Sequence, residues 1–236
     1  MIKELLPSQV ACVETTGDHA VSLFPEELAV VAGAVEKRRR EFGTARWCAR
    51  AALHGLGLPP TPIVPGPRGA PSWPPAIVGS ITHCAGFRAA AVAHQRDLVT
   101  LGIDAEPNEP LPHGVLEAIS LPEERAQHRR FGAFGSVCWD RLLFSIKESV
   151  YKAWYPITHR FLDFDGAIVR IDPERGTFHA ELRTPPAHVD GTRIAAFSGR
   201  WAATDSLLIS AIAVPNGCAV PIVQRTACGS EHSEGG

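Results

Sequence analysis

The chain lacks the features that mark several large classes of protein. Its six cysteines form no C-x-x-C pair, which argues against zinc, and a disulfide framework is not expected in 236 residues. No apolar run approaches the length of a membrane span, and the N-terminus shows no signal-peptide pattern. The formal net charge of −2 argues against broad nucleic-acid binding. We therefore expect a cytoplasmic protein with reduced thiols that binds neither nucleic acid nor membrane.

Proline is concentrated in two stretches that organise the chain. Residues 57–75 hold eight prolines, which predicts a stiff loop rather than a helix or a central strand. Its single cation is Arg68, and the sequence assigns that residue no contact. The second stretch, 107–113, is the predicted seam between two halves of the protein.

Three helical regions are predicted from apolar spacing and from proline and acids at their starts. The first begins at Pro25 and ends near Gly55, with a break at Gly43. The others begin at Leu121 and Ser136, and Pro156 is expected to end the last one. Strands are predicted over residues 76–80, 89–93, 98–105, 167–171, 178–182, 194–201 and 207–214.

Helices followed by strands occur in both halves, which predicts an α+β fold. We expect two similar α/β halves in a pseudo-twofold arrangement. The predicted division is 1–107 for the N-terminal half, 108–214 for the C-terminal half, and 215–236 for a disordered tail rich in glycine, serine and charge.

Two carboxylates stand at the end of a predicted strand. Asp104 and Glu106 alternate with Ile103 and Ala105, so both acids point to the same face of the strand. Carboxylates about 7 Å apart along a strand repel each other unless a cation lies between them. Mg²⁺ suits such a pair, because one or two carboxylates plus substrate phosphates and waters commonly hold it. The alternative is a solvated strand end with two acids.

An acid and a base share one face of the predicted helix at residue 136 onward. Glu148 and Lys152 are four residues apart, and Lys147 directly precedes the acid. Three carboxylates and two ammonium groups from two elements suit a metal-bound polyphosphate. The alternative for Glu148 and Lys152 is an ordinary surface ion pair.

Candidate anion-binding residues occur in the first half. Arg38 and Arg46 carry guanidinium donors that match the geometry of a phosphate. His83 lies at a strand end, with Ser80 nearby as a further phosphate donor. A solvated helix end for the arginines and a structural role for His83 are the alternatives.

Taken together, these segments resemble the 4′-phosphopantetheinyl transferase superfamily, in its enterobactin-synthetase-component-D-like actinobacterial branch. A Gly-Ile-Asp strand followed by a Lys-Glu-x3-Lys helix is specific as a pair, although each part alone is weak. The matching segments are Lys37-Arg38-Arg39-x-Glu41-Phe42-x3-Arg46, Gly79-Ser80-Ile81-Thr82-His83, Gly102-Ile103-Asp104-Ala105-Glu106-Pro107, Trp139-Asp140-Arg141 and Lys147-Glu148-x3-Lys152.

The resemblance implies a monomer that binds coenzyme A in the cleft between its two halves. It implies transfer of phosphopantetheine to a serine of acyl, peptidyl or aryl carrier proteins, as used in polyketide, nonribosomal peptide, siderophore and fatty acid synthesis. Adenosine 3′,5′-bisphosphate would be released. Mg²⁺, or Mn²⁺ in its place, would be held by Asp104, Glu106 and Glu148.

The same resemblance assigns roles to individual residues. Glu148 would be the base for the carrier serine, with Asp104 and Lys152 completing the catalytic set. The residues implied in coenzyme A binding are Arg38, Arg46, Ser80, His83, Lys147 and Lys152. A Mg²⁺-dependent phosphohydrolase and a non-catalytic coenzyme A-binding protein are the two alternative functions.

Overall fold

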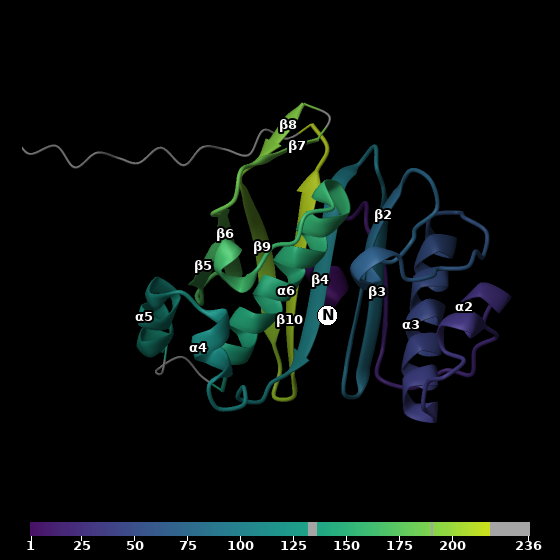
Figure 1. The fold of residues 1–236 in the computed structure, drawn as a ribbon, viewed down its shortest axis with the longest axis horizontal. Coiled ribbons are helices and arrows are strands. Elements are labelled where there is room, and N and C mark those ends of the chain that lie inside the picture. Colours follow the sequence, from purple (N-terminus) through teal and green to yellow (C-terminus); the bar gives the residue numbers. More distant parts are fainter. Residues whose placement is uncertain (132–135, 190, 218–236) are drawn as a thin grey trace, which may run out of the picture.

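The computed structural model describes residues 1–131, 136–189 and 191–217. The predicted tail therefore lies almost entirely outside the described residues. Within the described ranges, no helix has both the length and the apolar character needed to cross a membrane. The fold is α+β, as predicted, with antiparallel sheets and helices packed on them (Figure 1).

A three-stranded antiparallel sheet and several helices form the first part. The sheet has the order β1-β3-β2. Helix α3 packs on it through Cys48, Ala52 and Leu53. Helices and strands here are α1 Ile2–Leu5, β1 Ala11–Thr15, α2 Pro25–Val30, α3 Glu36–Gly55, η1 Pro67–Gly69, β2 Ile77–Cys84 and β3 Phe87–His94.

The helix break predicted at Gly43 is wrong. Helix α3 continues through Gly43, and the interruption falls between Val30 and Glu36. Arg39 explains this position, because its guanidinium donates to the carbonyls of Ala32 and Ala34 and closes the connection between the helices.

A five-stranded antiparallel sheet with the order β4-β10-β9-β6-β5 forms the second part. Helix α6 lies across one face and buries Ile146, Val150 and Trp154 against Phe197 and Leu208. Its elements are β4 Leu98–Pro107, α4 Val115–Ile119, α5 Pro122–Arg130, α6 Trp139–Thr158, η3 Phe164–Gly166, β5 Ala167–Asp172, β6 Thr177–Leu182, β7 Ala187–Val189, β8 Thr192–Ile194, β9 Ala196–Ala203 and β10 Leu207–Pro215.

Helix α6 does not end at Pro156 as predicted. It continues to Thr158 and stops at His159, whose φ of 52° is left-handed. A proline lacks only its own N–H donor, and in the last turn that loss removes a single helical bond. The Thr158 hydroxyl also donates to the carbonyl of Trp154 and helps to close this turn.

Strands β2 and β4 lie side by side but belong to different sheets (Figure 1). Two hydroxyls of β2 join them. Ser80 Oγ accepts a hydrogen bond of 3.1 Å from the amide of Ile103, and Thr82 Oγ1 accepts one of 3.0 Å from the amide of Ala105. Although β4 falls within the predicted N-terminal half, it pairs with β10 of the larger sheet. The division at residue 107 stays a prediction.

Candidate active site

Strand β4 carries a buried carboxylate to the seam between the sheets. The Asp104 side chain is 5% exposed, and its Oδ1 accepts a bond of 2.6 Å from Lys152 Nζ and one of 3.2 Å from Thr82 Oγ1. The predicted alternation holds, because Ile103 and Ala105 face the opposite core. The other oxygen, Asp104 Oδ2, is buried and accepts no hydrogen bond from the described residues.

Glu106 lies two residues further along the strand and is paired with a different cation. Its Oε2 accepts a bond of 3.1 Å from Arg141 Nη1 at the start of α6. Burial and the negative charge of Asp104 together raise the pKa of Glu106 to about 7, against the opposing effects of Arg141 and Lys152. This carboxyl group therefore exchanges its proton near neutral pH, and an approaching cation favours its ionised form.

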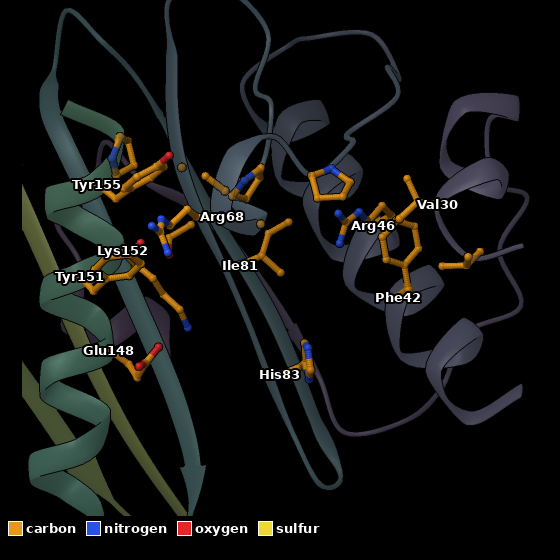
Figure 2. A pocket seen from close by; sticks show the side chains of 18 of the residues that line it. Val30, Phe42, Arg46, Arg68, Ile81, His83, Glu148, Tyr151, Lys152 and Tyr155 are labelled. Carbon is orange, nitrogen blue, oxygen red and sulfur yellow. The ribbon is translucent and has the colours of Figure 1, made fainter. Parts of the chain in front are cut away.

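Helix α6 presents Glu148 and Lys152 to the same region (Figure 2). Burial raises the pKa of Glu148, and Asp104 adds to that increase while Lys152 opposes it. A carboxylate with a raised pKa suits proton transfer at neutral pH. The predicted acid–base face of the helix is thus confirmed as a geometric arrangement, although Lys152 pairs with Asp104 rather than with Glu148.

Gly102 brings the strand and the helix close enough for these contacts. A Cβ atom at this position would lie 2.1 Å from the Ser149 carbonyl oxygen and 2.9 Å from the Ala153 amide nitrogen. Thr100 Oγ1 adds a hydrogen bond of 2.6 Å to the Ala153 carbonyl. Only glycine permits this approach, which places Lys152 over Asp104.

The acids fit a divalent cation only as part of a larger ligand set. Within the described residues, no group of three or more His, Cys, Asp or Glu side chains is placed to hold a metal ion by itself. Asp104, Glu106 and Glu148 therefore do not form a closed three-carboxylate centre. The unpartnered, buried Asp104 Oδ2 nevertheless fits a cation, since Mg²⁺ commonly takes one or two carboxylates and completes its shell with phosphates and waters.

A cavity of about 430 Å³ lies between α3 and α6, beside the β2 strand (Figure 2). Four of the predicted residues of the first half line it: Arg38, Arg46, Ser80 and His83. Glu148 and Lys152 line its other wall together with the aromatic rings of Tyr151 and Tyr155. The cavity therefore joins the predicted anion-binding residues to the acid–base residues of α6.

The predicted anion-binding residues have different hydrogen-bond partners in the structure. Arg38 Nη1 lies 3.0 Å from His83 Nε2. Arg46 Nε donates to the Ile63 carbonyl at 2.9 Å, and burial lowers its pKa to about 10, which still leaves a cation at neutral pH. Burial and the nearby Arg38 lower the pKa of His83, so this imidazole is neutral near pH 7. Ser80 Oγ accepts the hydrogen bond from the Ile103 amide that joins β2 to β4.

Lys147 forms an ion pair with Glu124 and with neither Asp104 nor Glu148. Its ammonium is buried against Glu124 at 2.9 Å and also donates to the carbonyls of Phe164 and Ala167. Glu124 in turn accepts from the amides of Leu121 and Val169. This geometry favours a structural role for Lys147, in place of the predicted contact with phosphate.

The proline-rich loop contributes a cation that the sequence did not assign. The loop folds back on itself, and the Trp73 indole donates to the Gly79 carbonyl and fixes the loop on β2. Arg68 lies at its tip in the left-handed region, with φ of 57°. Its guanidinium lies 4.9 Å from the ring centroid of Phe161, beyond the end of α6. The one signal in the sequence for a role of Arg68 was that it is the single cation in the proline-rich loop.

A second cavity of about 370 Å³ adjoins the first. Arg68, Glu148 and Tyr151 line both cavities, so these residues lie at their junction. The remaining lining of the second cavity is mainly apolar: Val150, Phe161, Leu162, Phe164 and Ala167, with Lys147 and Asp163. The acid Glu148 thus stands between a cavity with arginines and an apolar one.

Comparison with known proteins gives two matching family models. The "4′-phosphopantetheinyl transferase N-terminal domain" matches residues 25–93, and the "4′-phosphopantetheinyl transferase superfamily" matches residues 100–204.

Three curated relatives match over most of their length. The chain is 57% identical to 4′-phosphopantetheinyl transferase Svp of Streptomyces mobaraensis, over 91% of this chain and 89% of the relative. It is 46% identical to 4′-phosphopantetheinyl transferase Npt of Nocardia iowensis, over 90% and 99%. It is 44% identical to 4′-phosphopantetheinyl transferase PptT of Mycobacterium tuberculosis, over 80% and 85%.

The chain therefore belongs to the 4′-phosphopantetheinyl transferase superfamily. It is a transferase that moves the 4′-phosphopantetheine group of coenzyme A to carrier proteins.

Proposed function

We propose that this transferase requires Mg²⁺, or Mn²⁺ in its place, and modifies a serine of acyl, peptidyl or aryl carrier proteins. The released product is adenosine 3′,5′-bisphosphate. One observation carries the proposal: Asp104 is buried with its Oδ2 unpartnered, and its Oδ1 binds Lys152, which lines the first cavity beside Glu148. A cation and a polyphosphate together would satisfy both groups.

Coenzyme A spans the two cavities in this proposal. The phosphorylated nucleotide lies in the first cavity, where Arg38, Arg46 and the neutral His83 offer donors to its 3′-phosphate. Arg68, at the junction, meets the diphosphate. The apolar second cavity accepts the pantetheine arm, which leaves the reacting phosphorus beside Glu148.

Asp104, Glu106 and Glu148 would be the residues that hold the divalent cation. When bound, the cation neutralises charge that develops on the diphosphate leaving group. Lys152, which pairs with Asp104 in the structure, would be the cation that neutralises a phosphate oxygen. Phosphoryl transfer depends mainly on such positioning and charge neutralisation.

Glu148 is the proposed base, because its raised pKa and its place between the cavities suit removal of a hydroxyl proton. The carrier serine oxygen bonds to the phosphorus that carries pantetheine, and its proton passes to Glu148. The bond from that phosphorus to the bridging oxygen breaks, and adenosine 3′,5′-bisphosphate leaves. We further infer a cytoplasmic monomer acting on polyketide, nonribosomal peptide or fatty acid carriers.

Intact-mass spectrometry of an apo carrier protein tests the proposal directly. Incubation with the enzyme, coenzyme A and Mg²⁺ is expected to add the mass of one phosphopantetheine arm, and EDTA should abolish the gain. Asp104→Asn and Glu148→Gln are expected to lower the rate about 100-fold or more. The exposed Glu181→Gln serves as the control.

Full activity in EDTA would contradict the metal requirement. Full activity of both acid variants would contradict the site. Phosphate release from coenzyme A without a carrier would favour the phosphohydrolase alternative.

A further inference from the structure

Arg141, at the start of α6, donates hydrogen bonds from three nitrogen atoms to residues 106–110. Nη1 binds Glu106 Oε2, Nε donates to the Glu109 carbonyl and Nη2 donates to the Pro110 carbonyl, all at 3.1 Å. The neighbouring Asp140 accepts from the Leu111 amide at 2.8 Å. The first turn of α6 thus holds the chain from residue 106 to residue 111 in place.

The two acids of β4 are therefore paired with cationic side chains that differ in how tightly other groups hold them. The Lys152 ammonium has Asp104 as its one hydrogen-bond partner within the described residues, and its side chain is 27% exposed. The Arg141 guanidinium is fixed by two carbonyls besides its carboxylate partner. A planar fork held at three points keeps its orientation, while a lysine on a flexible stem can move to a substrate.

Arg141 engages only one oxygen of Glu106. Within the described part of the chain, Arg141 is the one side chain that donates to Glu106, through Oε2, and Oε1 accepts no hydrogen bond. A metal-bound carboxylate is commonly oriented by an outer partner of this kind, which limits its rotation and leaves the remaining oxygen for the metal.

We propose that Arg141 is a positioning residue of the metal site, which orients Glu106 through one carboxylate oxygen and leaves the other for the divalent cation. This inference rests on the proposed function, because it requires that Glu106 binds the cation. Loss of such an outer partner typically weakens metal affinity by about 10–100-fold. The expected effect falls on cation binding before any chemistry takes place.

Mn²⁺ titration followed by electron paramagnetic resonance measures this effect without turnover, using full-length enzyme saturated with coenzyme A and no carrier protein. Arg141→Gln is expected to weaken Mn²⁺ binding about 10–100-fold. Arg141→Lys is expected to weaken it as well, since an ammonium cannot reach three acceptors. The control is Arg170→Gln, which breaks an exposed arginine–glutamate pair on β5 and β6.

A double-variant cycle separates positioning from general structural damage. Glu106→Gln alone is expected to weaken Mn²⁺ binding, and adding Arg141→Gln to it should cause no further loss, because both changes remove one interaction. Coenzyme A affinity in EDTA and the thermal unfolding midpoint report whether each variant is folded. If Arg141→Gln does not fold, Arg141→Lys carries the test.

Wild-type Mn²⁺ affinity in both Arg141 variants would overturn the positioning role, as would fully additive losses in the cycle. Absence of Mn²⁺ binding by the wild-type enzyme would overturn the proposed metal set, and the positioning role with it. The two failures are therefore distinguishable.

Discussion

The charge of Glu106 depends on its burial and on the charges beside it. Burial and Asp104 raise its pKa from 4.5 to about 7. Between these values the folded protein binds more protons than the unfolded chain, so stability falls as pH rises through this window. A divalent cation competes with that proton, so cation affinity rises with pH until the carboxylate is ionised.

Glu106→Gln is expected to remove this part of the pH dependence. In EDTA, the thermal unfolding midpoint of the wild-type protein should fall relative to that of the variant as pH rises from about 4.5 to about 7. Differential scanning calorimetry at several pH values measures the difference. Parallel curves for the two proteins would mean that Glu106 titrates normally, and Glu181→Gln provides the control.

Lys147 leads to a prediction about stability. Lys147→Met leaves Glu124 buried without its cation, and breaking a buried pair in this way costs roughly 3–5 kcal/mol of unfolding free energy. Arg170→Met, in an exposed pair, should cost about 1 kcal/mol or less. Urea unfolding measures both. The affinity of folded Lys147→Met for coenzyme A should be unchanged, and a large loss there would restore the phosphate role.

Helical spacing explains why the placement of Lys152 could be read from the sequence while the pairing of Lys147 could not. Residues 148 and 152 are four apart and share a face of α6, so their common placement is readable from the sequence. Lys147 is adjacent in sequence to Glu148, but successive side chains on a helix point in directions about 100° apart. Its partner Glu124 lies on α5, and sequence gives no signal for that pairing.

At the scale of elements, the site depends on how closely α6 approaches β4. Gly102→Ala places a methyl group against backbone atoms of Ser149 and Ala153, which cannot rotate away. We expect a loss of about 1–3 kcal/mol in stability. A displacement of about 1 Å between Asp104 and Lys152 is expected to lower turnover about 100-fold.

Gly33→Ala is the matched control, since its Cβ would contact nothing within 4 Å. Chemical denaturation and carrier-loading kinetics measure both variants. Normal stability and turnover in Gly102→Ala would show that the close approach is dispensable.

Element types were more predictable than element ends. Proline content correctly indicated that residues 57–75 form no α-helix or sheet strand, but the position of Arg68 depends on where Trp73 anchors that loop. Pro156 and Gly43 were poor markers of helix ends, because the first costs one bond in a final turn and the second lies within a packed helix. Tertiary contacts decide such cases, and local sequence does not report them.

At the scale of the whole molecule, side-chain hydroxyls replace a backbone ladder between the two sheets. Thr82→Val removes the acceptor for the buried Ala105 amide and should cost about 1–3 kcal/mol. Hydrogen exchange should quicken at Ala105 more than at Ile103, whose acceptor Ser80 remains. Equal protection in wild type and variant would show that another group joins the sheets. Thr177→Val, on the partly exposed β6, is the control.

The two α+β halves were predicted from the order of helices and strands, yet the partner of β4 was not. Strand β4 pairs with β10, which lies near the far end of the described chain. Alternation in β4 correctly indicated which side chains are buried, but it carries no information about which distant strand completes the sheet. The joining of the sheets by Ser80 and Thr82 was hidden for the same reason.

The separate pairing of Asp104 with Lys152 and of Glu106 with Arg141 has a consequence for how substrate reaches the enzyme. Because each carboxylate is neutralised by an adjacent cation, the two acids exert little long-range repulsion on an approaching polyanion. Three cavity arginines form no ion pair within the described residues: Arg38, Arg46 and Arg68. Although the protein has a net negative charge, its coenzyme A cavity is lined by uncompensated positive charges. We therefore expect the association rate constant for coenzyme A to be high at low ionic strength and to fall as salt is added.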